Sequence, residues 1–247
     1  MKRAFWISLL AILAFALILF LRFPASWAAR WLPPGVTCNQ LSGTIWTGTC
    51  SGLVAQGVQV DNASWQLQRV TLLTGRIVGH LEATRGTNFV RGDIEARSGR
   101  LIARNLAVDL PLDRSMIPQL PAGLSGNANA QLRLLQIENG VLTAVQGDLE
   151  GHDLVNVDRG QRLVLGSYRV SFPVTDASKD PVGELRSLNG PLSVDGTLTL
   201  TRSPPGFVAK GTVAAHSDAS PQLVQSISYL GSPDAQGRRE FAVENTF

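Results

Sequence analysis

Most of the chain alternates between apolar and polar residues with a period of two. In residues 192–200, Leu192, Val194, Leu198 and Leu200 fall on one face and mainly polar side chains fall on the other. Because successive side chains of a strand point to opposite faces, this pattern predicts a half-buried β-strand. Similar segments follow one another from residue 31 onward, so the sequence predicts a mainly β domain.

Two further segments are predicted to bury one face each. The first face carries Ile102, Leu106, Val108 and Leu110, and the second carries Val164, Tyr168, Val170 and Phe172.

A hairpin is predicted around Asn139-Gly140, because both residues tolerate the positive φ angles of a two-residue turn. The predicted pairing sets Ile137 opposite Leu142 and Leu135 opposite Ala144.

Glycine followed by any residue and then an apolar one recurs through the domain. The glycines of this motif are Gly43, Gly75, Gly92, Gly126, Gly147, Gly196 and Gly211. A glycine at a strand start or bend lets a sheet curve, although chance in a glycine-rich β-sequence is the alternative. The predicted fold is a curved, twisted antiparallel β-sheet that forms a groove or a partial barrel.

One or two short helices are expected to accompany the sheet. Ser220 is a suitable N-cap, Pro221 suits the first helical position, and Gly231 can end the helix. Leu223, Ile227 and Leu230 form a stripe that should lie on the sheet. Residues 113–120, bounded by prolines, are a second candidate for a helical turn.

The N-terminal segment differs from the rest of the chain. Residues 4–21 form an uncharged apolar run of 18 residues, which as a helix would cover about 27 Å of the hydrocarbon core. The prediction is a transmembrane anchor at 4–21, after a cytoplasmic N-terminus at 1–3 and before a juxtamembrane linker at 22–36. A cleaved signal peptide is the alternative, with a longer apolar run than usual.

The charged residues also differ between the N-terminal segment and the rest of the chain. The formal net charge is +3, but residues 1–30 contain four basic residues and no acid, which leaves 18 Lys and Arg against 19 Asp and Glu in residues 31–247. A basic nucleic-acid-binding domain is therefore not expected. Lys2, Arg3 and the α-amine precede the apolar run, and Arg22 and Arg30 follow it. This slight excess of positive charge on the N-terminal side favours an N-terminus in the cytoplasm and a large domain outside.

Two cysteines, Cys38 and Cys50, lie twelve residues apart with no histidine nearby. A short disulfide loop in an oxidising compartment such as the periplasm explains them better than a metal site, with two buried thiols as the alternative.

Motifs for catalysis are absent from the sequence. It contains no phosphate-binding glycine loop, nucleophile elbow or zinc-binding helix motif, and its three histidines are far apart. We expect no catalytic, cofactor or metal site, no small-molecule substrate and no enzymatic activity. Trp46 and Trp65, each beside small residues, are expected to be core anchors, or else to line a hydrophobic groove or a partner interface.

Several segments, taken in order, resemble the type II secretion system protein N family. They are residues 43–48 (GTIWTG), Trp65, residues 72–77 (LLTGRI), 165–168 (LGSY), 190–196 (GPLSVDG) and the end region with Leu230-Gly231 and residues 233–238 (PDAQGR). The N-terminal anchor matches too, so the resemblance covers nearly the whole chain. The Cys38/Cys50 pair and the last residues, 244–247, are not matched.

The resemblance implies a single-pass protein of the bacterial inner membrane with a periplasmic β-domain at 37–247. It implies an accessory role in exporting folded proteins across the outer membrane, through contacts with inner-membrane secretion components and the outer-membrane secretin. It implies no catalytic residues. The general pattern of the sequence is also similar to that of AsmA-like proteins. This similarity implies, as the alternative function, a periplasmic groove that binds lipid or another hydrophobic molecule.

Overall fold

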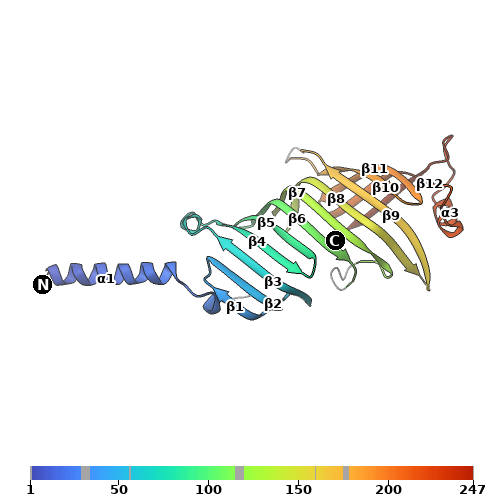
Figure 1. Ribbon diagram of the computed structural model, residues 1–247. Helices are drawn as coiled ribbons and strands as arrows, with labels where there is room; N and C mark the ends of the chain where they lie inside the picture. The colour runs from blue at the N-terminus through green and yellow to red at the C-terminus, as the bar shows by residue number, and fades with distance from the viewer. Residues whose placement is uncertain are drawn as a thin grey trace.

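The chain folds into one long antiparallel sheet with a helix projecting from one end (Figure 1). The computed structural model describes residues 2–28, 34–55, 57–114, 120–158, 160–174 and 178–246. The proposed helical turn at 113–120 and the linker at 22–36 lie partly outside these residues.

The helices are α1 (Lys2–Leu21), α2 (Ala25–Ala28) and α3 (Pro221–Ser228), with a 3₁₀ helix η2 (Val70–Thr74). The strands are β1 (Val36–Gly43), β2 (Thr47–Ala55), β3 (Val58–Leu67), β4 (Ile77–Arg85), β5 (Asn88–Arg97), β6 (Arg100–Leu112), β7 (Leu124–Glu138), β8 (Val141–Asp158), β9 (Gln161–Phe172), β10 (Val182–Asn189), β11 (Leu192–Arg202), β12 (Pro205–Ala215) and β13 (Arg239–Thr246).

Each strand pairs with its neighbours in sequence, so the order in the sheet runs from β1 to β13 without a crossover. Within the described residues, the sheet is open, with β1 and β13 as its two edges. The prediction of a mainly β, antiparallel fold with few short helices is confirmed.

One face of this sheet is apolar from edge to edge. A single row of registered partners crosses all thirteen strands, and we call it the apolar row. It runs Leu41, Cys50, Ala63, Ala83, Val90, Val108, Ala130, Leu149, Val170, Leu185, Gly196, Gly211 and Phe241.

The opposite face is polar over the same distance. Moving one residue along every strand gives a second registered row, the polar row. It runs Ser42, Thr49, Ser64, Glu82, Arg91, Ala107, Gln131, Asp148, Ser171, Glu184, Thr197, Lys210 and Ala242. Since adjacent residues of a strand face opposite sides, the two rows separate an apolar from a polar surface.

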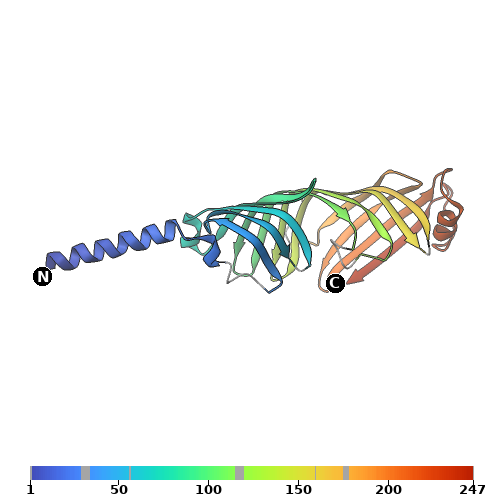
Figure 2. The same ribbon diagram turned by 60° about the horizontal axis from the view of Figure 1, so that its bottom comes forward.

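The sheet curls toward its apolar face. Leu198 and Leu200 on β11 pack against the buried cluster that includes Val145 on β8 and Phe172 on β9. Strands β8 and β11 are three positions apart, about 14 Å in a flat sheet, so this contact requires curvature. The guanidinium of Arg202 also donates a hydrogen bond of 2.8 Å to the Thr143 carbonyl, again joining the β11 end to β8. Figure 2 shows the resulting trough.

Glycines permit the curl where strands approach closely. Gly147 has a φ of +126°, and a Cβ there would lie 2.2 Å from the Gln131 carbonyl oxygen on β7. Gly196 and Gly211 face each other across β11 and β12, where a Cβ on either would meet the partner backbone at 2.3 Å. A glycine at these positions removes the side-chain volume that a concave face would otherwise compress.

Three predictions about which residues lie on the same face of a strand, or pair across two strands, are wrong. Each error has a local cause. Asn105 adopts a left-handed φ of +51°, and this irregularity places Ile102 on the polar face, beside Glu95 and Gln136, while Leu106 stays on the apolar face. Gly166 has a φ of +97°, and this irregularity reverses the alternation of β9. Val164 therefore does not share the face of Tyr168 and is 51% exposed.

The third error concerns the hairpin at Asn139-Gly140. Ile137 does pair with Leu142, but Leu135 pairs with Val145, because the register shifts by one residue between Gln136 and Ile137. A bulge of this kind adds one residue to one strand and is not visible in a two-residue period.

Helix α3 lies against the far end of the trough. Ser220 is its N-cap and accepts a hydrogen bond from the Leu223 amide, as predicted. Leu223 is buried in a cluster with Leu192 and Val213. The helix ends earlier than Gly231, with Tyr229 as its C-cap, so Leu230 remains exposed.

Helix α1 stands away from the sheet (Figures 1 and 2). Most of the large apolar side chains described on this helix are exposed, from 42% at Phe20 to 68% at Ile7. Among the residues whose placement is described, the structure contains no helix that meets the length and apolarity of a membrane span.

Candidate functional site

The apolar face is filled in one half of the sheet and hollow in the other. Across β7 to β9, Ala130, Leu132, Val145 and Phe172 bury one another. Near the α1 end, the same face opens into a cavity of about 530 Å³. The hollow end is therefore the part of the apolar face with room for a bound group.

The cavity lining is almost entirely apolar. Its walls are formed by Ala25, Val36, Cys38, Leu41, Ile45, Cys50, Leu53, Ala63, Trp65, Leu67, Ile77, Leu81 and Ile94. Such a lining offers few side-chain hydrogen-bond partners, so it suits a hydrocarbon group better than a polar ligand.

Trp65 on β3 forms part of the cavity wall. Its ring lies over Gly48 on β2, where a Cβ would come within 2.3 Å of the ring. The indole nitrogen donates a hydrogen bond of 3.1 Å to the Ile45 carbonyl, which fixes the ring plane. Trp65 is thus half-buried, with its polar atom satisfied and its apolar edge on the cavity.

Trp46 has a different position and lies outside the cavity wall. It is 1% exposed and joins α1 to the sheet. Its indole nitrogen donates to the Phe20 carbonyl at 2.8 Å, and the two rings meet edge to face at 4.8 Å. The guanidinium of Arg69, the N-cap residue of η2, lies 5.9 Å from the Trp46 ring centre. We call these three residues the anchor junction.

Backbone contacts reinforce the anchor junction. The Ile45 amide donates to the Phe23 carbonyl at 3.0 Å, and Pro24 forms an isolated bridge with Thr44. Sequence reasoning singled out Trp46 but missed Phe20 and Arg69. The apolar run containing Phe20 gave no sign that one of its residues contacts the sheet.

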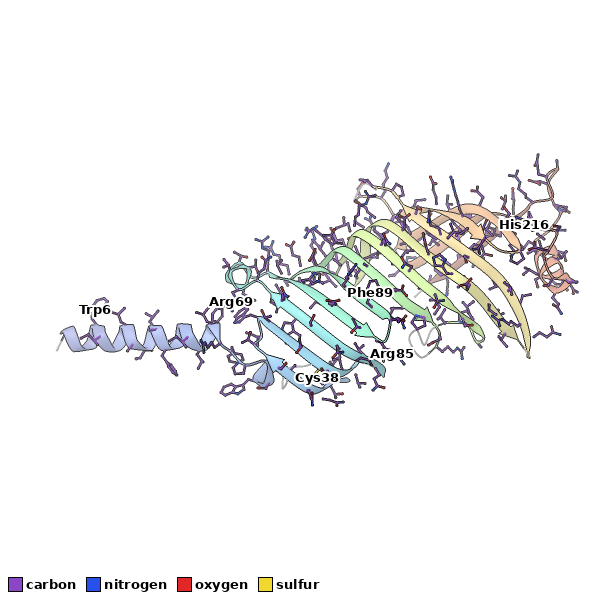
Figure 3. All side chains as sticks on the ribbon, viewed as in Figure 1. Trp6, Cys38, Arg69, Arg85, Phe89 and His216 are labelled. Carbon is purple, nitrogen blue, oxygen red and sulfur yellow. A yellow bond between two sulfur atoms is a disulfide. The ribbon has the colours of Figure 1, made fainter. Side chains whose placement is uncertain are left out.

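Cys38 on β1 and Cys50 on β2 form a disulfide at the edge of the sheet, with Cα atoms 6.0 Å apart. Cys50 belongs to the apolar row, and both cysteines line the cavity. The bond therefore ties edge strand β1 to β2 beside the cavity (Figure 3).

The polar face carries paired charges. The Asn105 amide and His80 hydrogen-bond to Asp93, at 2.9 Å each, and hold the pKa of that carboxyl below its usual range. Burial alone would raise the pKa of Glu150, but hydrogen bonds from Arg169 and His152 outweigh it and lower the pKa. Pairs that are at least partly exposed, as these are, contribute little stability each and keep the surface charged and hydrated.

No cluster of three or more metal-ligating side chains occurs in the part of the chain that the structure describes. His80 and His152 each contact a carboxylate on the polar face.

Comparison with known proteins gives one consistent family. The family model described as "Type II secretion system (T2SS), protein N" matches residues 34–242, from just before β1 to the middle of β13. The chain is 27% identical over 248 residues to "Type II secretion system protein N" of Aeromonas hydrophila, covering 96% of each chain. It is 22% identical over 250 residues to the protein of the same name from Vibrio cholerae, covering 98% of each. No solved structure matches significantly.

Proposed function

The chain belongs to the type II secretion system protein N family, and we propose on that premise that it is an accessory inner-membrane component of this secretion machine. In this role, its β-domain contributes to export of folded proteins across the outer membrane through protein–protein contacts. The observation that carries the proposal is the match along nearly the full length to proteins of that name.

The proposed topology places α1 in the inner membrane and the sheet in the periplasm. The anchor would comprise residues 4–21, with residues 1–3 in the cytoplasm and residues 37–247 outside. The exposed apolar side chains around α1 and the basic residues Lys2 and Arg3 before it support this arrangement. A disulfide between Cys38 and Cys50 is consistent with an oxidising periplasm.

The polar face is the proposed surface for protein partners. It spans thirteen strands, and the charged residues on it, such as Glu82 and Glu184, are exposed. Edge strands β1 and β13 also offer backbone groups for strand addition. The proposed partners are other inner-membrane secretion components and the outer-membrane secretin. We propose no catalytic role, since the family resemblance brings no catalytic residues.

The apolar cavity favours a second candidate function, a lipid- or hydrophobe-binding groove. The hollow lies on the concave face, is lined by apolar side chains and begins beside the proposed anchor. The filled half of the same face argues against a groove that runs the whole length of the sheet.

Deletion of the gene, with complementation by the full chain, separates the two functions. If the chain is a secretion component, deletion should reduce the extracellular fraction of folded secretion substrates and leave them in the periplasm. Complementation should restore export. Unaltered secretion combined with an altered lipid composition of the membrane would contradict the first function and favour the groove.

A further inference from the structure

The 3₁₀ helix η2 exposes apolar side chains on a well-defined loop. Val70 is 75% exposed and Leu72 is also exposed. The polar groups of the loop are used internally, since the Thr71 hydroxyl donates to the Gln68 carbonyl at 2.8 Å and the Thr74 hydroxyl donates to the Thr71 carbonyl at 2.7 Å. Gly75, with a φ of +68°, closes the turn through its amide to Leu72.

The loop lies directly beside the end of α1. Arg69, its N-cap, lies over Trp46, and Trp46 donates to the Phe20 carbonyl in the last turn of α1. Both ribbon views place η2 next to this helix end, and Figure 3 shows Arg69 there. The Trp46 side chain thus contacts both Arg69 at the start of η2 and the last turn of α1.

The surroundings of the loop match the interface of a bilayer. Arg22 follows α1 directly, and Arg69 begins η2, so two guanidinium groups stand near the helix end. Trp27 on α2 is 63% exposed close to the same end. Exposed arginine and tryptophan beside apolar side chains are typical of the headgroup level, where cations meet lipid phosphates.

We propose that η2 is a second membrane contact, in which Val70 and Leu72 enter the headgroup region while Arg22 and Arg69 bind lipid phosphates. The inference rests on the proposed anchor. A helix of 20 residues is about 30 Å long, so an α1 that crosses the hydrocarbon core brings Phe20 to its far boundary. The contacts through Trp46 then hold η2 at the bilayer surface. Continuity with the anchor favours lipid over a protein as the occupant of this patch.

A second contact would fix how the β-domain stands on the membrane. The anchor junction ties the sheet to α1, and a lipid contact at η2 would add a second point on the membrane, so that the two together define an orientation. The apolar cavity between Ala25 of α2 and Ile77, which follows η2, would then be held close to the bilayer.

The test uses the full chain in liposomes of phosphatidylethanolamine and phosphatidylglycerol. An environment-sensitive fluorophore is attached to Val70→Cys in one sample and to Val174→Cys in the other, with the Cys38–Cys50 disulfide intact. Val174 is a matched control, because it is also 75% exposed but follows β9, about 24 Å further along the sheet than β4. Quenching is measured with a lipid carrying a nitroxide near its headgroup and with aqueous iodide.

The label at residue 70 should be quenched several-fold more by the lipid nitroxide than the label at 174, and several-fold less by iodide. Equal iodide quenching at both positions, in a chain that resists alkaline extraction, would overturn the η2 contact and leave the anchor intact. Equal lipid quenching at both positions would also overturn the assignment to η2. Release of the chain by alkaline extraction would overturn both the anchor and the inference built on it.

Discussion

Replacing Trp46 by alanine is expected to lower the free energy of unfolding of the sheet by about 3–5 kcal/mol, as for other fully buried tryptophans. The residue is 1% exposed, and its removal would leave a cavity between α1 and β2. It would also leave the Phe20 carbonyl without the indole donor and Arg69 without its aromatic partner. The measurement is urea unfolding of the detergent-solubilised full chain.

Two variants make this prediction specific. Trp46→Phe keeps a ring but loses the hydrogen bond to Phe20, so it should cost less than Trp46→Ala, with about 0.5–1.5 kcal/mol due to the lost hydrogen bond. Trp27→Ala removes an exposed tryptophan that contacts Phe23 and should change stability by no more than about 0.5 kcal/mol. If Trp27→Ala and Trp46→Ala were equally destabilising, the anchor junction would not have the role assigned to it.

The substitution Gly147→Ala is expected to destabilise the curved centre of the sheet by about 2–6 kcal/mol, from backbone strain and overlap together. At a φ of +126°, an alanine is strained, and its Cβ would lie 2.2 Å from the Gln131 carbonyl oxygen. The β7 and β8 backbones would have to separate where the trough is most densely packed. Urea unfolding of the purified chain measures the effect.

Gly140→Ala is the matched control for Gly147→Ala. Gly140 also has a positive φ, +82°, but a Cβ there meets no atom within 4 Å. Its substitution should therefore show the backbone strain alone, about 1–3 kcal/mol. Equal losses in the two variants would mean that close strand approach at Gly147 is unimportant for the curl.

The two-residue period in the sequence was enough to predict the class of fold. Residues 192–200 alternate in the structure as they do in the sequence, and they lie on β11 with Leu192 buried. The same reasoning failed at Ile102 and Val164, because Asn105 and Gly166 take positive φ angles that reverse the phase of their strands. Such bulges depend on how the paired strand fits, and a single strand's sequence does not contain that information.

The candidate site was predictable only in part. Small neighbours drew attention to Trp46 and Trp65, but their different positions follow from the three-dimensional path of the chain. Trp46 meets α1, and Trp65 lines the cavity. The loop η2 was missed as an element, since residues 72–77 stood out only by the glycine motif at Gly75 and by family resemblance. Its proximity to α1 arises through Trp46, 24 residues earlier in the chain than Val70.

The polar face of the β-domain is the proposed contact surface for secretion components. Site-specific photo-crosslinking in intact cells tests it most directly, with the photoreactive residue at Glu82 or at Leu81. These neighbours on β4 are both exposed and lie on opposite faces, Glu82 in the polar row and Leu81 at the cavity. A probe at Glu82, or at Glu184 on β10, should capture proteins of the type II secretion machine, whereas a probe at Leu81 should not. Capture of no secretion component from either polar-face position would mean that this face is not the contact surface.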